Sequence, residues 1–210
     1  ERSRRQRQMC IRDRTSTAIS RFPVPELSSL PDDLKQIISD VQDKAGFIPN
    51  VFLTLAHRPD ELRAFWAYHE ALMRRNSGLS KAECEMIVVA TSAANNCLYC
   101  VVAHGAILRI YEKSAQISEQ IATNFRKADI TDRQKAMLVF AEKVALQSAK
   151  IDEADFHILH EHGFSDEDIW DIGAITALFA LSNRMASLIS MRPNDEFFTM
   201  GRCFGMPNDN

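Results

Sequence analysis

Apolar residues recur every three or four positions along most of this chain, which is the spacing of one face of an α-helix. The first such segment begins at Pro31-Asp32-Asp33, where proline suits the first turn and the acids suit the positive end of the helix dipole, and it ends at Gly46. The same pattern predicts further helices at residues 49–56, 59–78, 80–94, 97–111, 117–125, 131–146 and 152–162. Seven glycines and seven prolines are few for a loop-rich or all-β protein, so we expect an all-α fold.

Two of the expected helices begin with a capping box, in which a serine or threonine and a residue three positions later satisfy each other's backbone N–H groups. These are Ser80-Lys-Ala-Glu83 and Thr131-Asp-Arg-Gln134. The first of them starts the helix that leads to the most reactive part of the chain.

The region around this capping box occurs a second time. Gly78-Leu-Ser80 recurs as Gly163-Phe-Ser165, offset by 85 residues. Extending the offset pairs reactive residues with inert ones: Glu85 with Trp170, Cys97 with Ser182, Cys100 with Met185 and His104 with Ile189. We therefore expect an internally duplicated helical hairpin whose second copy lacks the chemistry of the first.

Length and composition limit the class of protein. The chain has 210 residues, 46% of them hydrophobic, and a net charge of only −3, so there is no reason to expect binding to nucleic acid. No apolar run reaches the roughly 18 residues of a membrane span, and no stretch is typical of a signal peptide. Five cysteines suit a reducing compartment better than a disulfide scaffold, so we expect a cytoplasmic protein.

The two ends differ from the rest of the chain. Six arginines lie within the first fourteen residues, which is typical of a basic arm or of a disordered or non-native extension. We expect residues 1–16 to be such an extension, residues 17–202 to form a single helical domain, and residues 203–210 to be a tail. The phenylalanines after Pro193 are candidates for docking on a neighbouring subunit.

One stretch concentrates the reactive side chains. On a helix, Cys97, Cys100 and His104 lie within roughly 60° of one another, so both sulfurs and the imidazole share a face. Asn95 and Asn96 precede them, and asparagine is a good N-cap. A thiol in the first turn of a helix is near free N–H groups and has a lowered pKa. This arrangement is typical of a redox-active dithiol.

Glu85 lies twelve residues before the first of these cysteines, on the preceding helix. Its neighbours along one line of that helix are Val88, Val89 and Ser92, which are mostly apolar. A carboxylate held there could act as a base near neutral pH. The alternative is a carboxylate at the end of a helical turn that reaches solvent.

Other interpretations of the two cysteines differ in how well they fit. A zinc site formed by Cys97, Cys100 and His104 lacks an obvious fourth ligand. A thioredoxin motif follows a buried strand, whereas residues 86–94 are rich in alanine and predict a helix. Covalent haem attachment needs a histidine directly after the second cysteine, where this chain has Val101. Two buried, inert cysteines remain an alternative.

The pattern Glu-x11-Cys-x2-Cys-x3-His resembles that of the AhpD-like alkylhydroperoxidases, within the carboxymuconolactone decarboxylase superfamily. Four further stretches are similar to the peroxidase-related branch of that group: Gly46-Phe-Ile-Pro-Asn-Val-Phe52, His57-Arg-Pro-Asp-Glu61, Ala90-Thr-Ser-Ala-Ala94 and Met191-Arg-Pro-Asn-Asp195. The resemblance covers roughly residues 17 to 202, and it implies an AhpD-like helical fold that assembles as a homo-oligomer, a trimer or hexamer.

The resemblance also implies an antioxidant enzyme that reduces hydroperoxides without a cofactor or metal. Cys100 corresponds to the attacking thiolate and Cys97 to the resolving thiol, while Glu85 and His104 correspond to the proton relay. A dithiol protein of lipoyl or thioredoxin type would restore the pair. Tyr99 departs from the histidine of the best-known relative, and a phenol cannot replace imidazole as a base. A redox sensor or a decarboxylase on the same scaffold are the alternatives.

Overall fold

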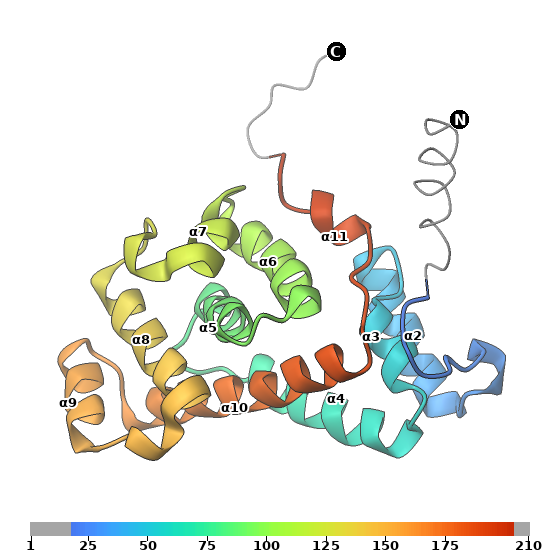
Figure 1. Ribbon diagram of the computed structural model, residues 1–210, viewed down its shortest axis with the longest axis horizontal. Coiled ribbons are helices and arrows are strands. Elements are labelled where there is room, and N and C mark those ends of the chain that lie inside the picture. The colour runs from blue at the N-terminus through green and yellow to red at the C-terminus, as the bar shows by residue number, and fades with distance from the viewer. Residues whose placement is uncertain (1–17, 204–210) are drawn as a thin grey trace, which may run out of the picture.

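The computed structural model describes residues 18–203, and over that range it consists of helices and the turns that join them (Figure 1). This confirms the all-α prediction. The expected N-terminal extension, residues 1–16, and residues 204–210 of the expected tail lie outside the described range.

The helices follow one another without any strand between them in residues 18–203. They are α2 (Asp32–Ala45), α3 (Asn50–Leu55), α4 (Pro59–Met73), α5 (Lys81–Ala94), α6 (Leu98–Glu112), α7 (Ile117–Asn124), α8 (Asp132–Gln147), α9 (Glu153–Glu161), α10 (Asp166–Leu188) and α11 (Glu196–Thr199), with short 3-10 helices η1 (Leu27–Ser29), η2 (Phe125–Lys127) and η3 (Ser148–Lys150). None of these helices is both long and apolar enough to cross a membrane.

Local chemistry sets several of the helix ends. The predicted capping boxes at Ser80 and Thr131 are both present, and Asp152 and Ser165 form two more at the starts of α9 and α10. Gly46 ends α2 in the left-handed conformation, with φ of 82°, as its position in the sequence predicts.

Two expectations about this part of the chain were wrong. α4 ends at Met73, five residues before Gly78, because the chain turns away to reach Ser80 at the start of α5. Phe197 is not available to dock on a neighbouring subunit, because it is buried within its own chain, edge-on to the rings of Phe47 and Tyr99.

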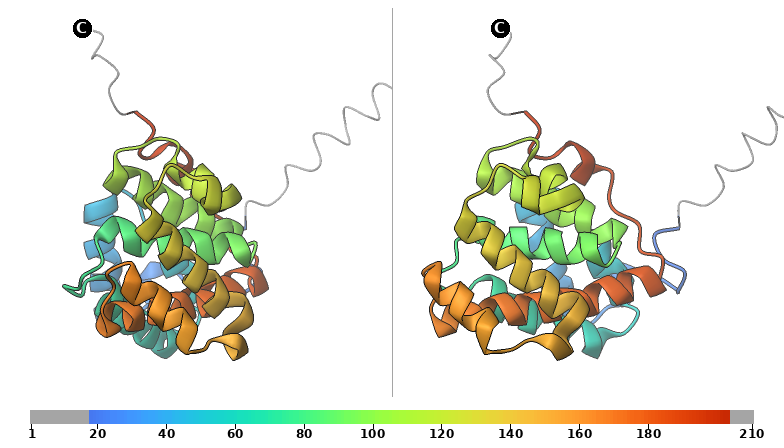
Figure 2. Two further views of the ribbon diagram at one scale, coloured as in Figure 1. Left: turned by 90° about the vertical axis from the view of Figure 1, so that its left-hand side faces the viewer. Right: turned by 60° about the vertical axis from the view of Figure 1, so that its left-hand side comes forward.

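α5 is the central helix of the fold, enclosed by α6, α7, α8 and α10 (Figures 1 and 2). Every residue from Ala82 to Ser92 is buried, which explains why this helix has apolar residues on all sides. Burial of each large apolar side chain contributes about 1.5–3 kcal/mol to stability. A second group of buried apolar residues joins α2, α3 and α4, and a third surrounds the start of α6.

The predicted duplication appears as two helix pairs, α4–α5 and α9–α10 (Figure 1). In each pair, a turn that contains a glycine leads to a capping-box serine, Ser80 or Ser165, and then to a long buried helix. The copies differ at their ends. α5 stops at Ala94 and turns into α6, whereas α10 continues without a break through residues 180–182, which align with that turn.

Gly105 on α6 lies against Ser118 of α7, with no room for a side chain. A Cβ atom at this position would lie 2.6 Å from Ser118 Oγ and 3.3 Å from Ser118 Cβ. Since Ser118 is buried and accepts a hydrogen bond from Arg109 Nη1, it has little room to move. We expect Gly105→Ala to lower the free energy of unfolding by about 1–3 kcal/mol, measured by urea denaturation. Gly173→Ala on α10, where a Cβ would meet nothing within 4 Å, is the control and should not destabilise.

Candidate active site

The two thiols lie where α5 turns into α6. Asn95 caps the end of α5, and Asn96 turns the chain with φ of 53°. The N-cap of α6 is Cys97 itself, not an asparagine as the sequence suggested, and its Sγ accepts a hydrogen bond from the backbone N–H of Cys100 at 3.4 Å. The sulfur therefore occupies the position at which a helix start stabilises negative charge.

The pKa values of the Cys97 and Cys100 thiols are shifted in opposite directions. The pKa of Cys97 is lowered to about 7, chiefly because the Cys100 thiol donates a hydrogen bond to it, with further help from the Cys100 backbone N–H, Asn183 and the charge of His104. The pKa of Cys100 is raised by the same hydrogen bond and by burial beside that charge. The negative charge of the first ionisation therefore rests mainly on Cys97.

Glu85 and His104 form a buried pair between α5 and α6. Glu85 Oε2 lies 2.8 Å from His104 Nδ1, and the two side chains are 7% and 14% exposed. The carboxylate is therefore not at a solvated helix end. Because a carboxylate only accepts, it places the imidazole hydrogen on Nδ1 and leaves Nε2 as the atom that exchanges protons. The edge of the imidazole faces the ring of Phe179, 4.7 Å away between centroids.

α10 supplies two polar residues that the sequence did not single out as part of the site. Ser182 Oγ lies 3.9 Å from Cys100 Sγ. Asn183 is buried, donates to Ser92 Oγ at 2.9 Å and accepts from Asn95 Nδ2 at 3.2 Å, and its amide acts to lower the pKa of both thiols. The offset of 85 residues aligned Ser182 with Cys97, but an alignment gives no information about contact.

Tyr99, the residue that departs from the family pattern, has a structural role. Its phenol oxygen accepts the backbone N–H of Val51 at 3.1 Å and so anchors α3 against α6. Burial raises the pKa of this phenol well above its usual value. Tyr99 is therefore not a base for either thiol, in agreement with the expectation from its chemistry.

His69 on α4 lies near the site. Its side chain is 18% exposed and stacks on Trp66, with ring centroids 4.9 Å apart. It also faces the edge of Phe179, the ring that contacts His104. Burial, then the nearby charge of His104, lowers the pKa of His69 to about 3, so this imidazole is neutral at physiological pH.

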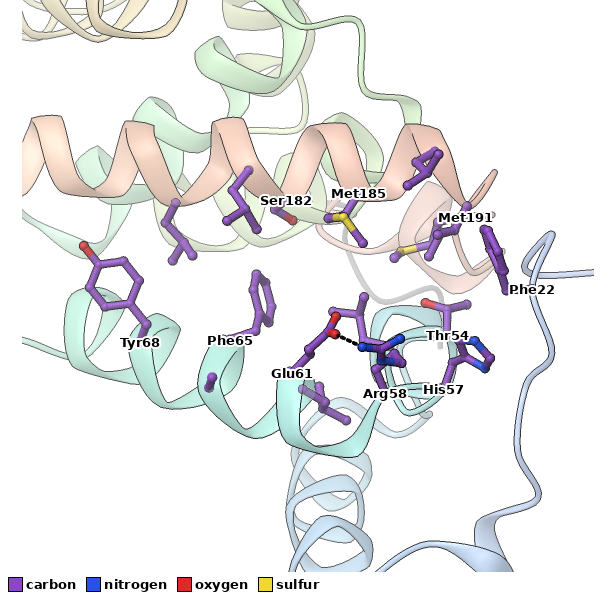
Figure 3. A pocket seen from close by; sticks show the side chains of 17 residues that line it. Phe22, Thr54, His57, Arg58, Glu61, Phe65, Tyr68, Ser182, Met185 and Met191 are labelled. Carbon is purple, nitrogen blue, oxygen red and sulfur yellow. Dashed lines mark ion pairs between the residues drawn. The ribbon is translucent and has the colours of Figure 1, made fainter.

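Apolar side chains from three segments cover the dithiol, so that Cys97 and Cys100 are each only 1% exposed. The cover consists of residues in or just before α3, residues at or just after the end of α10, and residues in or just after α11: Phe47, Val51, Leu55, Ala186, Ile189, Met191, Phe197 and Met200. On one side lies a pocket of about 580 Å³ between α4 and α10 (Figure 3). Ser182, Ile189 and Met191 belong to its wall, so the pocket approaches the dithiol from the α10 side.

The remaining cysteines of the described range are not part of this arrangement. Cys84 is a packing residue in the core around α5: burial, then Glu85, raises its pKa to about 12. Cys203 is exposed near the end of the described chain. Across residues 18–203, no three histidine, cysteine, aspartate or glutamate side chains are grouped so that they could hold a metal ion, and this includes the set considered for zinc.

The lowered pKa of Cys97 predicts a pH dependence. The thiolate is present above pH 7 and is lost as the pH falls below it, so the rate of alkylation should rise with a midpoint near pH 7, the pKa of this thiol. Asn183→Asp places a negative charge beside both sulfurs and should raise that midpoint by about one unit or more. Asn124→Asp, the same change at an exposed position, should leave it in place. An unchanged midpoint in Asn183→Asp would contradict the role given to this amide.

Comparison with known proteins relates the chain to one family. Residues 59–145 match the model of the carboxymuconolactone decarboxylase family. The fold is similar to that of an alkylhydroperoxidase AhpD core, an uncharacterized peroxidase-related protein from Ralstonia eutropha JMP134, at 68% identity and a TM-score of 0.89 over 90% of this chain and 100% of that one. An uncharacterized peroxidase-related protein from Silicibacter sp. TM1040 is 40% identical, with a TM-score of 0.85 over 90% of this chain and 98% of that one.

A more distant structure shares the fold alone. The debrominase Bmp8, solved in complex with 2,3,4-tribromopyrrole, is 21% identical with a TM-score of 0.71, over 87% of this chain and 95% of that one. A comparison with curated proteins gives no match.

Proposed function

The chain belongs to the AhpD-like group of the carboxymuconolactone decarboxylase family, and from this premise we propose that it reduces hydroperoxides with the thiols of Cys97 and Cys100. The proposal extends the peroxidase-related description of its relatives to a particular dithiol mechanism. Its main support is the position of the two thiols at the start of α6, where Cys97 is the N-cap and has a lowered pKa, on the same helix as the buried His104–Glu85 pair.

In the first step Cys100 passes its proton to the Cys97 thiolate and attacks the terminal oxygen of the hydroperoxide. The O–O bond breaks, the sulfur is oxidised by two electrons to a sulfenic acid, and the alkoxide takes a proton from Nε2 of the His104 imidazolium. Glu85 stabilises that imidazolium through its 2.8 Å contact with Nδ1. The products of this step are an alcohol and neutral His104.

In the second step His104 accepts the proton held by Cys97, and the Cys97 thiolate attacks the sulfur of Cys100. A disulfide forms, hydroxide leaves, and the imidazolium protonates it to water. An external dithiol then returns two electrons through a mixed disulfide. That the reductant is a lipoyl- or thioredoxin-like protein, and that the chain works as a homo-oligomer, stay predictions.

Access supports Cys100 as the attacking sulfur. It lies 3.9 Å from Ser182 Oγ, and Ser182 lines the pocket between α4 and α10. Cys97, as the N-cap, is the better site for the resting charge. The two roles are compatible because one proton moves between the sulfurs.

Turnover of cumene hydroperoxide with dithiothreitol as the electron donor tests this function. We expect catalytic loss of peroxide that depends on both the protein and the dithiol, and that saturates with peroxide. The same protein alkylated beforehand with iodoacetamide is the control. Peroxide loss no faster than with dithiothreitol alone would contradict the proposal.

A further inference from the structure

The pocket between α4 and α10 has the size and lining of a site for a small molecule. Its volume of about 580 Å³ lies within the roughly 300–1,000 Å³ that is usual for such sites. Leu62 and Phe65 of α4 form one apolar wall, and Leu178, Leu181 and Leu188 of α10 form the other (Figure 3). The pocket therefore favours an apolar ligand.

The pocket is elongated along both helices. On α10 its lining runs from Leu178 to Ile189, and on α4 from Arg58 to Tyr68. With a rise of about 1.5 Å per residue, each wall is roughly 15 Å long. A groove of this length fits an extended hydrocarbon chain better than a compact ring.

The groove comes nearest to the dithiol at Ser182, a lining residue that lies between its two ends and separates it from Cys100. Ser182, whose Oγ lies 3.9 Å from Cys100 Sγ, is one turn from Leu178 and two turns from Ile189 on the α10 wall. The groove thus extends past this serine in both directions. A hydroperoxide bound along it would present its O–O bond to Cys100 only if that bond were internal to the chain, with carbon on either side.

The two ends of the groove differ in charge. Tyr68 lies at one end, whereas Thr54, His57 and Arg58 lie toward the other, near Met191 and Phe22 (Figure 3). Arg58 Nη2 contacts Glu61 Oε1 at 2.7 Å, but the two side chains are 69% and 59% exposed, so this ion pair contributes little. Among residues 18–203 the Arg58 guanidinium has no other ion-pair partner. A ligand carboxylate could replace Glu61 and bind the guanidinium at two points.

We propose that the groove binds fatty-acid hydroperoxides, with the hydrocarbon chain between α4 and α10, the internal hydroperoxide at Ser182 and Cys100, and the carboxylate at Arg58. The proposal rests on the proposed function and adds the substrate class. It assigns Arg58 to substrate binding, far along the chain from the dithiol.

Binding of a redox-inert fatty acid tests the site without any turnover. We expect laurate to bind the wild-type protein in isothermal titration calorimetry, and Arg58→Gln to weaken it about tenfold, the loss of one charge-assisted contact. 1-Dodecanol, which has the same chain and no charge, should bind both proteins alike. Arg126→Gln, which removes an arginine from the exposed pair with Glu142, is the matched control.

Two outcomes would overturn the assignment of this groove. One is that laurate does not bind, or binds Arg58→Gln as tightly as the wild type. The other is that a second copy of the chain covers the groove: Leu181→Asp, at an exposed position on its wall, would then lower the oligomer mass in light scattering, and laurate would not bind. If the groove is open, Leu181→Asp should weaken laurate and dodecanol together.

Kinetics separate this inference from the function on which it rests. Arg58→Gln should raise KM for linoleic acid hydroperoxide about tenfold and leave KM for neutral cumene hydroperoxide unchanged. If both hydroperoxides are reduced but Arg58 affects neither, the substrate assignment fails and the dithiol function stands. If laurate binds with the expected dependence on Arg58 while neither hydroperoxide is reduced, the function fails and only the binding site stands.

Discussion

Replacing Cys100 with serine is expected to lower turnover of cumene hydroperoxide at least about a thousandfold, because a hydroxyl is not ionised near neutral pH and cannot attack the O–O bond as a thiolate does. The substitution is nearly isosteric at a buried position that contacts Ser182 and Asn183, so the fold should persist. Steady-state peroxide loss with dithiothreitol measures the turnover, and circular dichroism shows whether the fold persists.

Two other cysteine variants make this result specific. Cys203→Ser removes an exposed thiol and should keep full activity. Cys97→Ser removes both the proton acceptor for Cys100 and the resolving thiol, so it should react with peroxide more slowly than the wild type and then depend on the external thiol to reduce the sulfenic acid. If Cys97→Ser lost the reaction with peroxide and Cys100→Ser kept it, the two sulfurs would have the opposite roles, as the lower pKa of Cys97 taken by itself would suggest.

Replacing His104 with asparagine is expected to lower turnover about a hundredfold, which is typical for loss of a general acid that protonates a leaving alkoxide. Glu85→Gln keeps a side chain of the same size beside Nδ1 but removes the negative charge that stabilises the imidazolium, so a smaller loss of about tenfold is expected. The measurement is kcat against pH, because the loss should be greatest where the wild-type relay carries a proton.

The chain contains a matched control for this variant. His160 Nε2 lies 2.8 Å from Asp166 Oδ1, the same separation as in the Glu85–His104 pair. The side chains of His160 and Asp166, however, both face solvent. His160→Asn should leave turnover unchanged. Equal activity in His104→Asn and the wild type would remove the histidine from the mechanism.

The parts of the fold that depend only on residues close together in the sequence could be predicted. The capping boxes at Ser80 and Thr131 and the left-handed Gly46 are local features, and the structure has all three. The end of α4 could not be predicted in this way. Gly78 looks like a helix terminator, yet it lies near the Asp168 carboxylate of α10 in the folded chain, and packing of that kind has no local signature.

The site was predictable to the same extent. Cys97, Cys100 and His104 share a helix face because of their spacing, and the structure places Glu85 against His104 from the helix before. The identity of the N-cap was wrong because asparagine is the commoner N-cap, whereas the tight turn at Asn96 moves the helix start to the cysteine.

The polar residues from α10 could not be predicted. Ser182 lies 82 positions from Cys100 in the sequence, and Asn183 lies 91 positions from Ser92. Which face of α10 meets the start of α6 is decided by the burial of α5 between them, and that depends on the whole core rather than on any one segment.

A single turnover tests the central claim most directly. The reduced protein receives one equivalent of cumene hydroperoxide, its free thiols are counted, and its disulfides are mapped by peptide mass spectrometry. The dithiol mechanism predicts rapid loss of two thiols, release of one alcohol, and a disulfide between Cys97 and Cys100. Thiols that disappear no faster than free cysteine in solution, or a disulfide that excludes this pair, would contradict it.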